Sequence, residues 1–210
     1  LFPDELVESE LGEIPKDFFF PKFEDLVTAK QGKYLSKKDM LETQTDEFNI
    51  PVWGGNGVIG YSLKSTYSEP IVLMTCRGSN CGLIRYTSSA SWVSNNSFAC
   101  VSNFGSNWFL LNYFNRSSFD DCISGSAQPQ ITYTALKTKL LSYPINDVVV
   151  QEYSDLIEPL YRMLNSNGQQ INVLSRMRDS LLPKLLSGEL DISALTDLAD
   201  HAAEAGAAHV

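Results

Sequence analysis

Four lysines lie close together around a glycine in the segment KQGKYLSKKDM (30–40). They are Lys30, Lys33, Lys37 and Lys38, and they form the densest positive run in the sequence. A lysine ammonium group is a good partner for a phosphate oxygen. The run therefore suits contact with a phosphate-bearing ligand, and a solvated surface loop is the alternative interpretation.

The chain lacks the motifs by which catalytic sites are usually found in a sequence. It contains neither a GxSxG nucleophile elbow nor a GxxxxGK[ST] phosphate-binding loop. Residues 55–60 match GxGxxG, but the dinucleotide fingerprint needs a helix that opens at the glycines. Val58, Ile59 and Tyr61 favour a strand instead. We therefore expect no catalysis from this chain by itself.

The cysteines and histidines do not have the spacing of a metal site. The sequence has no CxxC pair, and its two histidines, His201 and His209, lie in an Ala-rich tail. We expect no metal and four reduced, buried thiols. These belong to Cys76, Cys81, Cys100 and Cys122.

The net charge of −9 is unevenly distributed along the 210 residues. Residues 1–15 carry five acids and no base, and residues 146–210 carry ten acids and four bases. Residues 16–145 carry twelve bases and ten acids, a net of +2. The acidity lies at the ends, so a local positive face on the central part is compatible with the composition.

Membrane insertion and secretion are not indicated. No uncharged apolar run approaches the roughly 18 residues that a membrane span needs. The N-terminus is acidic, whereas a signal peptide begins with basic residues followed by an apolar run. We expect a cytoplasmic protein.

The central part has the pattern of a mixed α+β domain with mostly non-parallel strands. GlyGlyAsnGly at 54–57 separates two apolar runs and predicts a hairpin turn. A short buried helix is expected over 106–115, and Thr132 or Thr134 could cap a turn over 135–138. The segment 23–27 suits either a strand or a short helix. Further strands are predicted at Ile71–Cys76, Leu83–Tyr86, Trp92–Val93, Ser97–Ser102 and Leu140–Ile145.

A long amphipathic helix follows the central part. From residue 150 onward, apolar residues recur at alternating spacings of three and four, which is typical of a helix that packs on another helix. Pro159 should either begin the long helix or kink a continuous one. A helix folded back on its own domain is the alternative to a projecting arm. The predicted seam consists of Ile157, Leu160, Leu164, Asn167, Ile171, Leu174, Arg178, Leu181 and Leu185.

Four segments in this order resemble one known family. They are SELGEIPKD (9–17), PVWGGNGVIGY (51–61), GSAQPQIT (125–132) and RDSLLPKLLSGEL (178–190). Together they closely resemble the DNA-specificity (S) subunit of type I restriction-modification enzymes. The resemblance implies a target-recognition domain followed by a conserved helical region that packs antiparallel on a second such helix as a spacer.

The same resemblance implies the partners. Methyltransferase (M) subunits would supply S-adenosylmethionine and the chemistry, a restriction (R) subunit would cut, and this chain would hold no cofactor. The chain departs from the pattern because it has one recognition domain and one helical region, so a C-terminal half, a fragment or a natural half-subunit all remain open. Self-association, or pairing with an N-terminal half-subunit, would cover the apolar seam.

A reader of double-stranded DNA needs Lys and Arg for phosphates and Asn, Gln or Arg for base edges. For each candidate, turn chemistry is the alternative role. WGGNG and GSAQP are shared motifs of the family, so we rank Asn56 and Gln128 below the other main candidates. The preferred residues are Lys33, Lys37, Lys38, Arg77 and Asn80. The full set is Lys30, Lys33, Lys37, Lys38, Asn56, Arg77, Asn80, Asn95, Asn96, Gln128 and Gln130.

We expect four segments along the chain. They are an acidic linker (1–15), a DNA target-recognition domain (16–146), a helical coiled-coil spacer (147–188) and a partly disordered acidic and Ala-rich tail (189–210). The competing hypothesis is an assembly module that scaffolds methyltransferase subunits without reading DNA itself.

Overall fold

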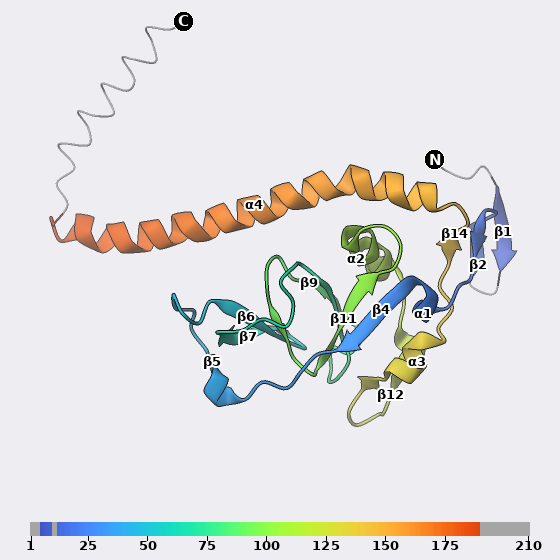
Figure 1. Cartoon of the computed structure of the whole chain (residues 1–210), viewed down its shortest axis with the longest axis horizontal. Coiled ribbons are helices and arrows are strands. Elements are labelled where there is room, and N and C mark those ends of the chain that lie inside the picture. Colours follow the sequence, from blue (N-terminus) through green and yellow to red (C-terminus); the bar gives the residue numbers. More distant parts are fainter. Residues whose placement is uncertain (1–4, 10–11, 190–210) are drawn as a thin grey trace, which may run out of the picture. The chain divides into compact units, whose positions relative to one another are not determined.

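A computed structural model describes residues 5–9 and 12–189 of the chain (Figure 1). The chain divides into two compact units, Leu1–Tyr161 and Arg162–Val210. None of the described helices is both long enough and apolar enough to cross a membrane. The predicted tail, with His201 and His209, lies outside the described residues except for Glu189.

A four-stranded antiparallel sheet forms the centre of the first unit, in the order β4-β11-β8-β9. The two inner strands are the most apolar. Every residue of β8 is buried, as are the first four of β11, so the sheet is covered on both faces. The strands are β4 (Val27–Gln31), β8 (Val72–Thr75), β9 (Ile84–Tyr86) and β11 (Ser97–Ser102).

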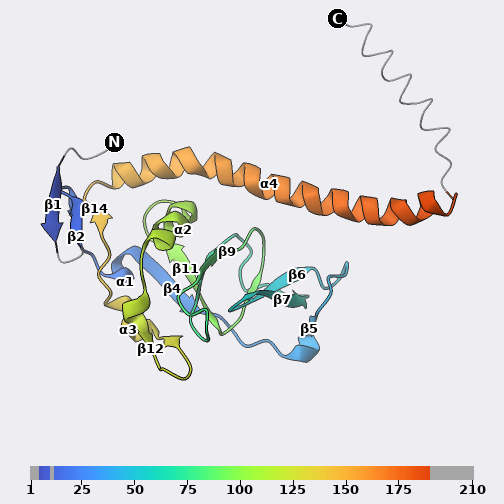
Figure 2. The same ribbon diagram turned by 180° about the vertical axis from the view of Figure 1, so that it is seen from behind.

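A second four-stranded sheet has the order β10-β6-β7-β5. The predicted hairpin is confirmed, because β6 and β7 pair antiparallel around the Gly55-Asn56 turn. β10 pairs parallel with β6, whereas the other described strand pairs are antiparallel. The predicted α+β fold with mostly non-parallel strands is therefore confirmed. The strands are β5 (Met40–Leu41), β6 (Ile50–Gly54), β7 (Gly57–Ser62) and β10 (Trp92–Val93). In both views β5, β6 and β7 lie at one end of this unit, and α1 and α3 lie at the other (Figures 1 and 2).

Short elements complete the first unit. The ambiguous segment near residue 23 is a single helical turn that leads into β4, and Thr132 caps α3 by accepting from the Ala135 amide. The strand expected over 140–145 is shorter and pairs with β3. The helices are α1 (Phe23–Leu26), η1 (Lys37–Asp39), α2 (Asn107–Arg116), η2 (Asp120–Cys122) and α3 (Tyr133–Lys137). The strands are β1 (Leu6–Ser9), β2 (Gly12–Pro15), β3 (Phe18–Phe19), β12 (Ile123–Ser124), β13 (Gln130–Ile131) and β14 (Tyr143–Pro144).

The acidic leader is more ordered than the sequence predicts. The sequence predicts an acidic linker over 1–15, but residues 6–9 (β1) pair antiparallel with residues 12–15 (β2). An ion pair of 2.7 Å between Lys16 Nζ and Glu5 Oε2 joins the ends of the hairpin. The pair is exposed and adds little stability. The backbone ladder therefore accounts for most of the order.

Aromatic side chains dominate the core. Phe23 and Phe114 are almost fully buried, and their stacked rings lie 5.7 Å apart. α2 begins where Ser106 accepts a hydrogen bond from the Phe109 amide. Trp108 on α2 stacks on Tyr161 of the long helix at 4.0 Å between ring centroids. The stack attaches the start of that helix to the first unit.

The long helix α4 (Asp147–Leu186) is continuous through Pro159. At about 1.5 Å per residue its 40 residues span roughly 60 Å. Pro159 therefore does not begin the helix. It lies between Ile157 and Tyr161, which both pack on the core of the first unit. These contacts on either side offset the loss of one helical hydrogen bond.

Ile157 differs from the rest of the predicted seam. It is only 9% exposed and belongs to the core with Val150, whereas Leu160 and Ile171 are more than 60% exposed. A 3.5-residue repeat drifts by about 20° per heptad around a straight α-helix. Over four heptads this drift separates Ile157 from Leu185. Ile157 is therefore a core residue and is not available to a second helix.

The structure predicts a clear order of thiol reactivity. All four cysteines are free, and only Cys81 is not fully buried. Burial raises the pKa of the Cys76 thiol from 9.0 to about 11, and burial likewise raises that of Cys122 to about 11. The thiolate fraction at pH 8 then falls by about 100-fold. With Ellman's reagent at pH 8, Cys81 should react first and the others about 100-fold more slowly than in urea. Four equally fast native thiols would contradict this arrangement.

Candidate nucleic-acid interface

The β6–β7 turn meets the loop that follows β8. Thr75 Oγ1 donates to the Gly55 carbonyl at 2.9 Å. The Asn80 side-chain Nδ2 donates to Asn56 Oδ1 at 2.7 Å, which joins two loops that lie 24 residues apart. Arg85 Nη2 on β9 donates to the Asn56 carbonyl at 3.2 Å. Two predicted amide candidates are thus neighbours at the end of the central sheet.

The same end of the sheet receives the segment that carries Gln130. Arg77 and Gln130 form an isolated antiparallel bridge, and the Gly78 amide donates to the Pro129 carbonyl at 3.0 Å. A cavity of about 210 Å³ is lined by Gln31, Arg77, Gln130 and Tyr133, among others. Arg77 and Gln130 therefore share one recess.

The turn between β10 and β11 brings the third pair of candidates. The Asn96 carbonyl accepts from the Cys76 amide at 2.8 Å, and the Asn95 carbonyl accepts from Gln31 Nε2 at 2.8 Å. These hydrogen bonds involve the backbone carbonyls of Asn95 and Asn96, so they do not occupy the side-chain amides of the two residues. We call the six residues gathered here the polar cluster. It consists of Asn56, Arg77, Asn80, Asn95, Asn96 and Gln130.

Few carboxylates occur in the part of the chain that forms the polar cluster. Between residues 48 and 146 the only acids are Glu69, Asp120 and Asp121. Glu69 precedes β8, whose opposite end leads into the cluster. The same stretch carries six bases: Lys64, Arg77, Arg85, Arg116, Lys137 and Lys139. The chain is acidic as a whole, but this region has a positive balance that favours a polyanion.

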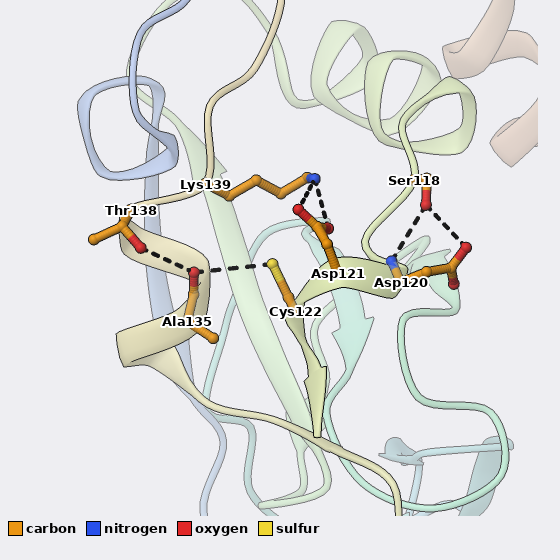
Figure 3. Close-up of polar contacts among 7 residues, drawn as sticks. All are labelled: Ser118, Asp120, Asp121, Cys122, Ala135, Thr138 and Lys139. Atoms are coloured by element: carbon orange, nitrogen blue, oxygen red, sulfur yellow. Dashed lines mark hydrogen bonds and ion pairs between the residues drawn. The ribbon is translucent and has the colours of Figure 1, made fainter. Parts of the chain in front are cut away.

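Figure 3 shows the contacts of the two aspartates, Asp120 and Asp121, which precede the GSAQP segment in the chain. Lys139 Nζ binds Asp121 at 2.7 Å and 2.8 Å, and its hydrogen bond lowers the pKa of that carboxyl. Cys122 Sγ donates to the Ala135 carbonyl at 3.9 Å, and Asp120 accepts from Ser118 (Figure 3). The Cys122–Ala135 contact joins η2 to α3, and the Lys139–Asp121 pair joins η2 to the residues that follow α3.

Gln128 belongs to that β12–β13 turn and is exposed, two residues before Gln130. Gly125 begins the turn with a φ of +86°, and an added Cβ there would lie 2.7 Å from the Gln128 carbonyl oxygen. A left-handed conformation with so close a contact favours glycine. The geometry is consistent with a structural role for the shared GSAQP motif.

The lysines do not join the polar cluster as one group. Lys30 lies between Ala29 and Gln31 on β4, and both of these neighbours line the recess that contains Arg77. Because successive side chains of a strand point to opposite sides, the Lys30 side chain points away from the recess. Lys37 and Lys38 lie on η1 and are exposed. Lys38 lines a separate cavity of about 540 Å³ with Lys64.

Lys33 is fixed by its backbone. Its amide donates to the Val93 carbonyl at 2.9 Å, and its carbonyl accepts from Trp92 Nε1 at 3.0 Å. The Lys33 side chain is exposed. The backbone contacts of Lys33 therefore position an exposed ammonium group where the chain passes from β4 towards η1.

Sequence reasoning missed Arg85 and Gln31. Both lie on strands, whereas the search favoured loops, yet both bond to the polar cluster. Arg85 Nε is buried with no hydrogen-bond partner among the described residues. The available signal was Arg85 itself, a cation inside the apolar strand segment LIRY.

The sequence of the chain matches one protein family. A family model described as the type I restriction modification DNA specificity domain matches residues 15–176. That match covers well over half of the chain. The chain belongs to this family. Its members are non-catalytic specificity components of type I restriction-modification systems.

A curated relative and two solved structures are similar to the chain. The specificity subunit of the type I restriction enzyme MjaIX of Methanocaldococcus jannaschii is 33% identical over 73 residues, which are 35% of this chain and 17% of that protein. The crystal structure of a type I restriction-modification S subunit from M. genitalium matches 81% of this chain and 46% of its own, with a TM-score of 0.64 and 15% identity.

The second structure comes from work on complex assembly and conformational transition of the type I system. It also matches 81% of this chain and 46% of its own, with a TM-score of 0.52 and 14% identity. At such identities the likeness concerns the fold. The chain spans less than half the length of these solved chains.

Proposed function

We propose that this chain recognises one part of a split DNA target for a type I restriction-modification complex. The polar cluster would face base edges, and the exposed lysines at 33, 37 and 38 would contact phosphates. The observation that carries the proposal is the convergence of six predicted base-reading candidates in a region with few carboxylates. Asn, Gln and Arg are the side chains that read base edges in the major groove.

In this proposal α4 is a spacer and a docking arm. Residues 162–186 expose a stripe that includes Leu164, Ile171 and Leu174, each more than 60% exposed. Covering it with a second helix would hold two recognition domains at a fixed distance, so that half-site spacing would follow from the symmetry. The second helix would come from another copy of this chain or from an N-terminal half-subunit.

The proposed partners follow from membership of the type I specificity family. Methyltransferase subunits would bind S-adenosylmethionine and modify the DNA, and a restriction subunit would cut unmodified sites. The exposed stripe also supports the second candidate function, an assembly module that docks those subunits without reading DNA. The two functions differ in whether this chain alone determines the target sequence.

Methylation mapping tests the proposal. The chain would be expressed with its cognate methyltransferase in a host, and modified bases would be mapped across the genome. We expect one discrete split motif, palindromic for two copies of this chain and asymmetric for an N-terminal partner. Exchanging the polar-cluster loops for those of a related chain should change the motif. Unchanged methylation after that exchange would favour the assembly module.

The phosphate contacts predict a salt effect. Each phosphate contact contributes about 0.9 to the slope of log affinity against log salt concentration. Replacing Lys33, Lys37 and Lys38 by Gln should lower that slope by up to about 2.7, measured by fluorescence anisotropy on duplex DNA with the methyltransferase present. Lys184→Gln removes a single lysine charge on α4, outside the first unit, and as the control it should leave the slope unchanged. Equal effects of both changes would argue against phosphate contact at this site.

A further inference from the structure

We propose that Asn80 reads one A·T base pair and that Asn56 is the positioning residue that orients the Asn80 side-chain amide. This inference rests on the proposed function and assigns separate roles within the polar cluster. Both side chains are exposed, and their bond of 2.7 Å runs from Asn80 Nδ2 to Asn56 Oδ1. An exposed amide pair across two loops fixes a side chain that would otherwise rotate freely.

The bond leaves the right groups on Asn80 for adenine. A side-chain amide has two N–H donors and a carbonyl acceptor. One donor goes to Asn56, which leaves Asn80 with a second N–H and its Oδ1 for a base. Asparagine binds adenine through these two groups, which meet N7 and N6 in the major groove. The bond therefore restricts the rotation of the Asn80 amide before DNA binds.

The Asn56 side of the pair is held in place by backbone contacts. Arg85 Nη2 donates to the Asn56 carbonyl at 3.2 Å, and Thr75 Oγ1 donates to the preceding carbonyl, of Gly55, at 2.9 Å. Both donors come from the central sheet, from β9 and β8. The turn that carries Asn56 is therefore fixed to a rigid element, which is what a positioning role requires.

The same arrangement explains why a shared family motif adjoins a recognition site. Asn56 lies in WGGNG, and its carbonyl and Oδ1 both accept bonds from within the protein. Asn80 lies outside that motif and retains groups for a base. A fixed residue of the shared turn would thus orient a residue that can vary between targets.

The test compares the target motif of the wild-type chain with those of single variants. Each would be expressed with the cognate methyltransferase, and methylated sites would be mapped. Asn80→Ala should relax discrimination at one base-pair position by about 5- to 150-fold and leave the other positions unchanged. Asn80→Asp removes the donor for adenine N7 and should shift that position away from A·T. Asn115→Ala, at an exposed position on α2, is the control and should leave the motif intact.

The positioning role of Asn56 is tested by comparing the target motif and the melting temperature of Asn56 variants. Asn56→Ala should relax the same base-pair position as Asn80→Ala, whereas a purely structural role would lower the melting temperature without altering the motif. Asn56→Asp keeps the acceptor for Asn80 and should retain the motif, with weaker overall DNA binding at low salt.

The outcomes separate this inference from the proposed function. If the wild-type chain specifies no discrete motif, the proposed function fails. If it specifies a motif that Asn80→Ala and Asn80→Asp both leave unchanged, only the inference is overturned. Loss of all DNA binding by a folded Asn80 variant would also overturn it, because a single-position reader leaves the phosphate contacts in place.

Discussion

Gly32→Ala is expected to destabilise the first unit by about 3 kcal/mol, at the upper end for overpacking, because the atoms in its way are backbone. A Cβ at residue 32 would lie 2.7 Å from the carbonyl carbon of Ser94 and closer still to the carbonyl oxygens of Val93 and Ser94. The Gly32 amide donates to the Ser97 carbonyl at 2.9 Å, and the Lys33 amide donates to the Val93 carbonyl at 2.9 Å. Movement that relieves the clash would therefore break bonds between β4 and the β10–β11 segment.

Urea denaturation followed by tryptophan fluorescence measures this effect. Trp53, Trp92 and Trp108 all belong to the first unit, so the signal reports its unfolding. Gly168→Ala is the matched control, because nothing lies within 4 Å of a Cβ added there on α4. That change should leave the fluorescence midpoint unchanged and favour the helix by about 1 kcal/mol, seen as greater helical stability by circular dichroism. Equal midpoints for the two variants would show that the close approach at Gly32 is relieved easily.

Ile171→Asp combined with Leu174→Asp is expected to weaken arm-mediated association by at least about 100-fold. Each side chain is 63% exposed on the single chain. Burying a large aliphatic side chain contributes about 1.5–3 kcal/mol, and a carboxylate in an apolar seam adds a desolvation cost. Sedimentation velocity over a concentration series measures the change. The same variant should lose methylation of a split motif while the first unit stays folded.

The matched control places two carboxylates on the other side of α4. Gln169→Asp with Ser180→Asp changes the net charge by the same amount at exposed positions roughly half a turn from the seam. This control should associate as the wild-type chain does. A wild-type chain that stays monomeric at high concentration, with or without an N-terminal half-subunit, would remove the spacer from the proposed function. Equal effects of both double variants would point to charge rather than to the apolar stripe.

The sequence was most informative where the signal was local. The GlyGlyAsnGly turn, the strands near 72–75 and 97–102, and the helix over 107–116 all follow from turn chemistry and periodicity within a few residues. The segment 140–145 was harder, because only Tyr143 and Pro144 find a strand partner, in β3. Strand length depends on the partner as well as on propensity.

The candidate site could be predicted as a set of residue types but not as an arrangement. Asn56, Asn80 and Gln130 are spread over 74 residues. Only long-range contacts bring their loops together, through the Asn80–Asn56 hydrogen bond and the Arg77–Gln130 bridge. The sequence grouped Lys30 with the other lysines because they are neighbours in the chain. The alternation of side chains along β4 turns Lys30 away from the recess that Gln31 and Arg77 line.

In the long helix, too, some features follow from the sequence and others only from the tertiary structure. By itself, the sequence determined that residues after 147 form an amphipathic helix with an apolar stripe, because the 3-4 spacing is a property of the chain. Tertiary structure alone decided that Ile157 is buried in the core while Leu160 is exposed, and that the helix continues through Pro159. The reason is that a helical period fixes which residues share a face, whereas burial depends on the surfaces that the rest of the fold brings against that face.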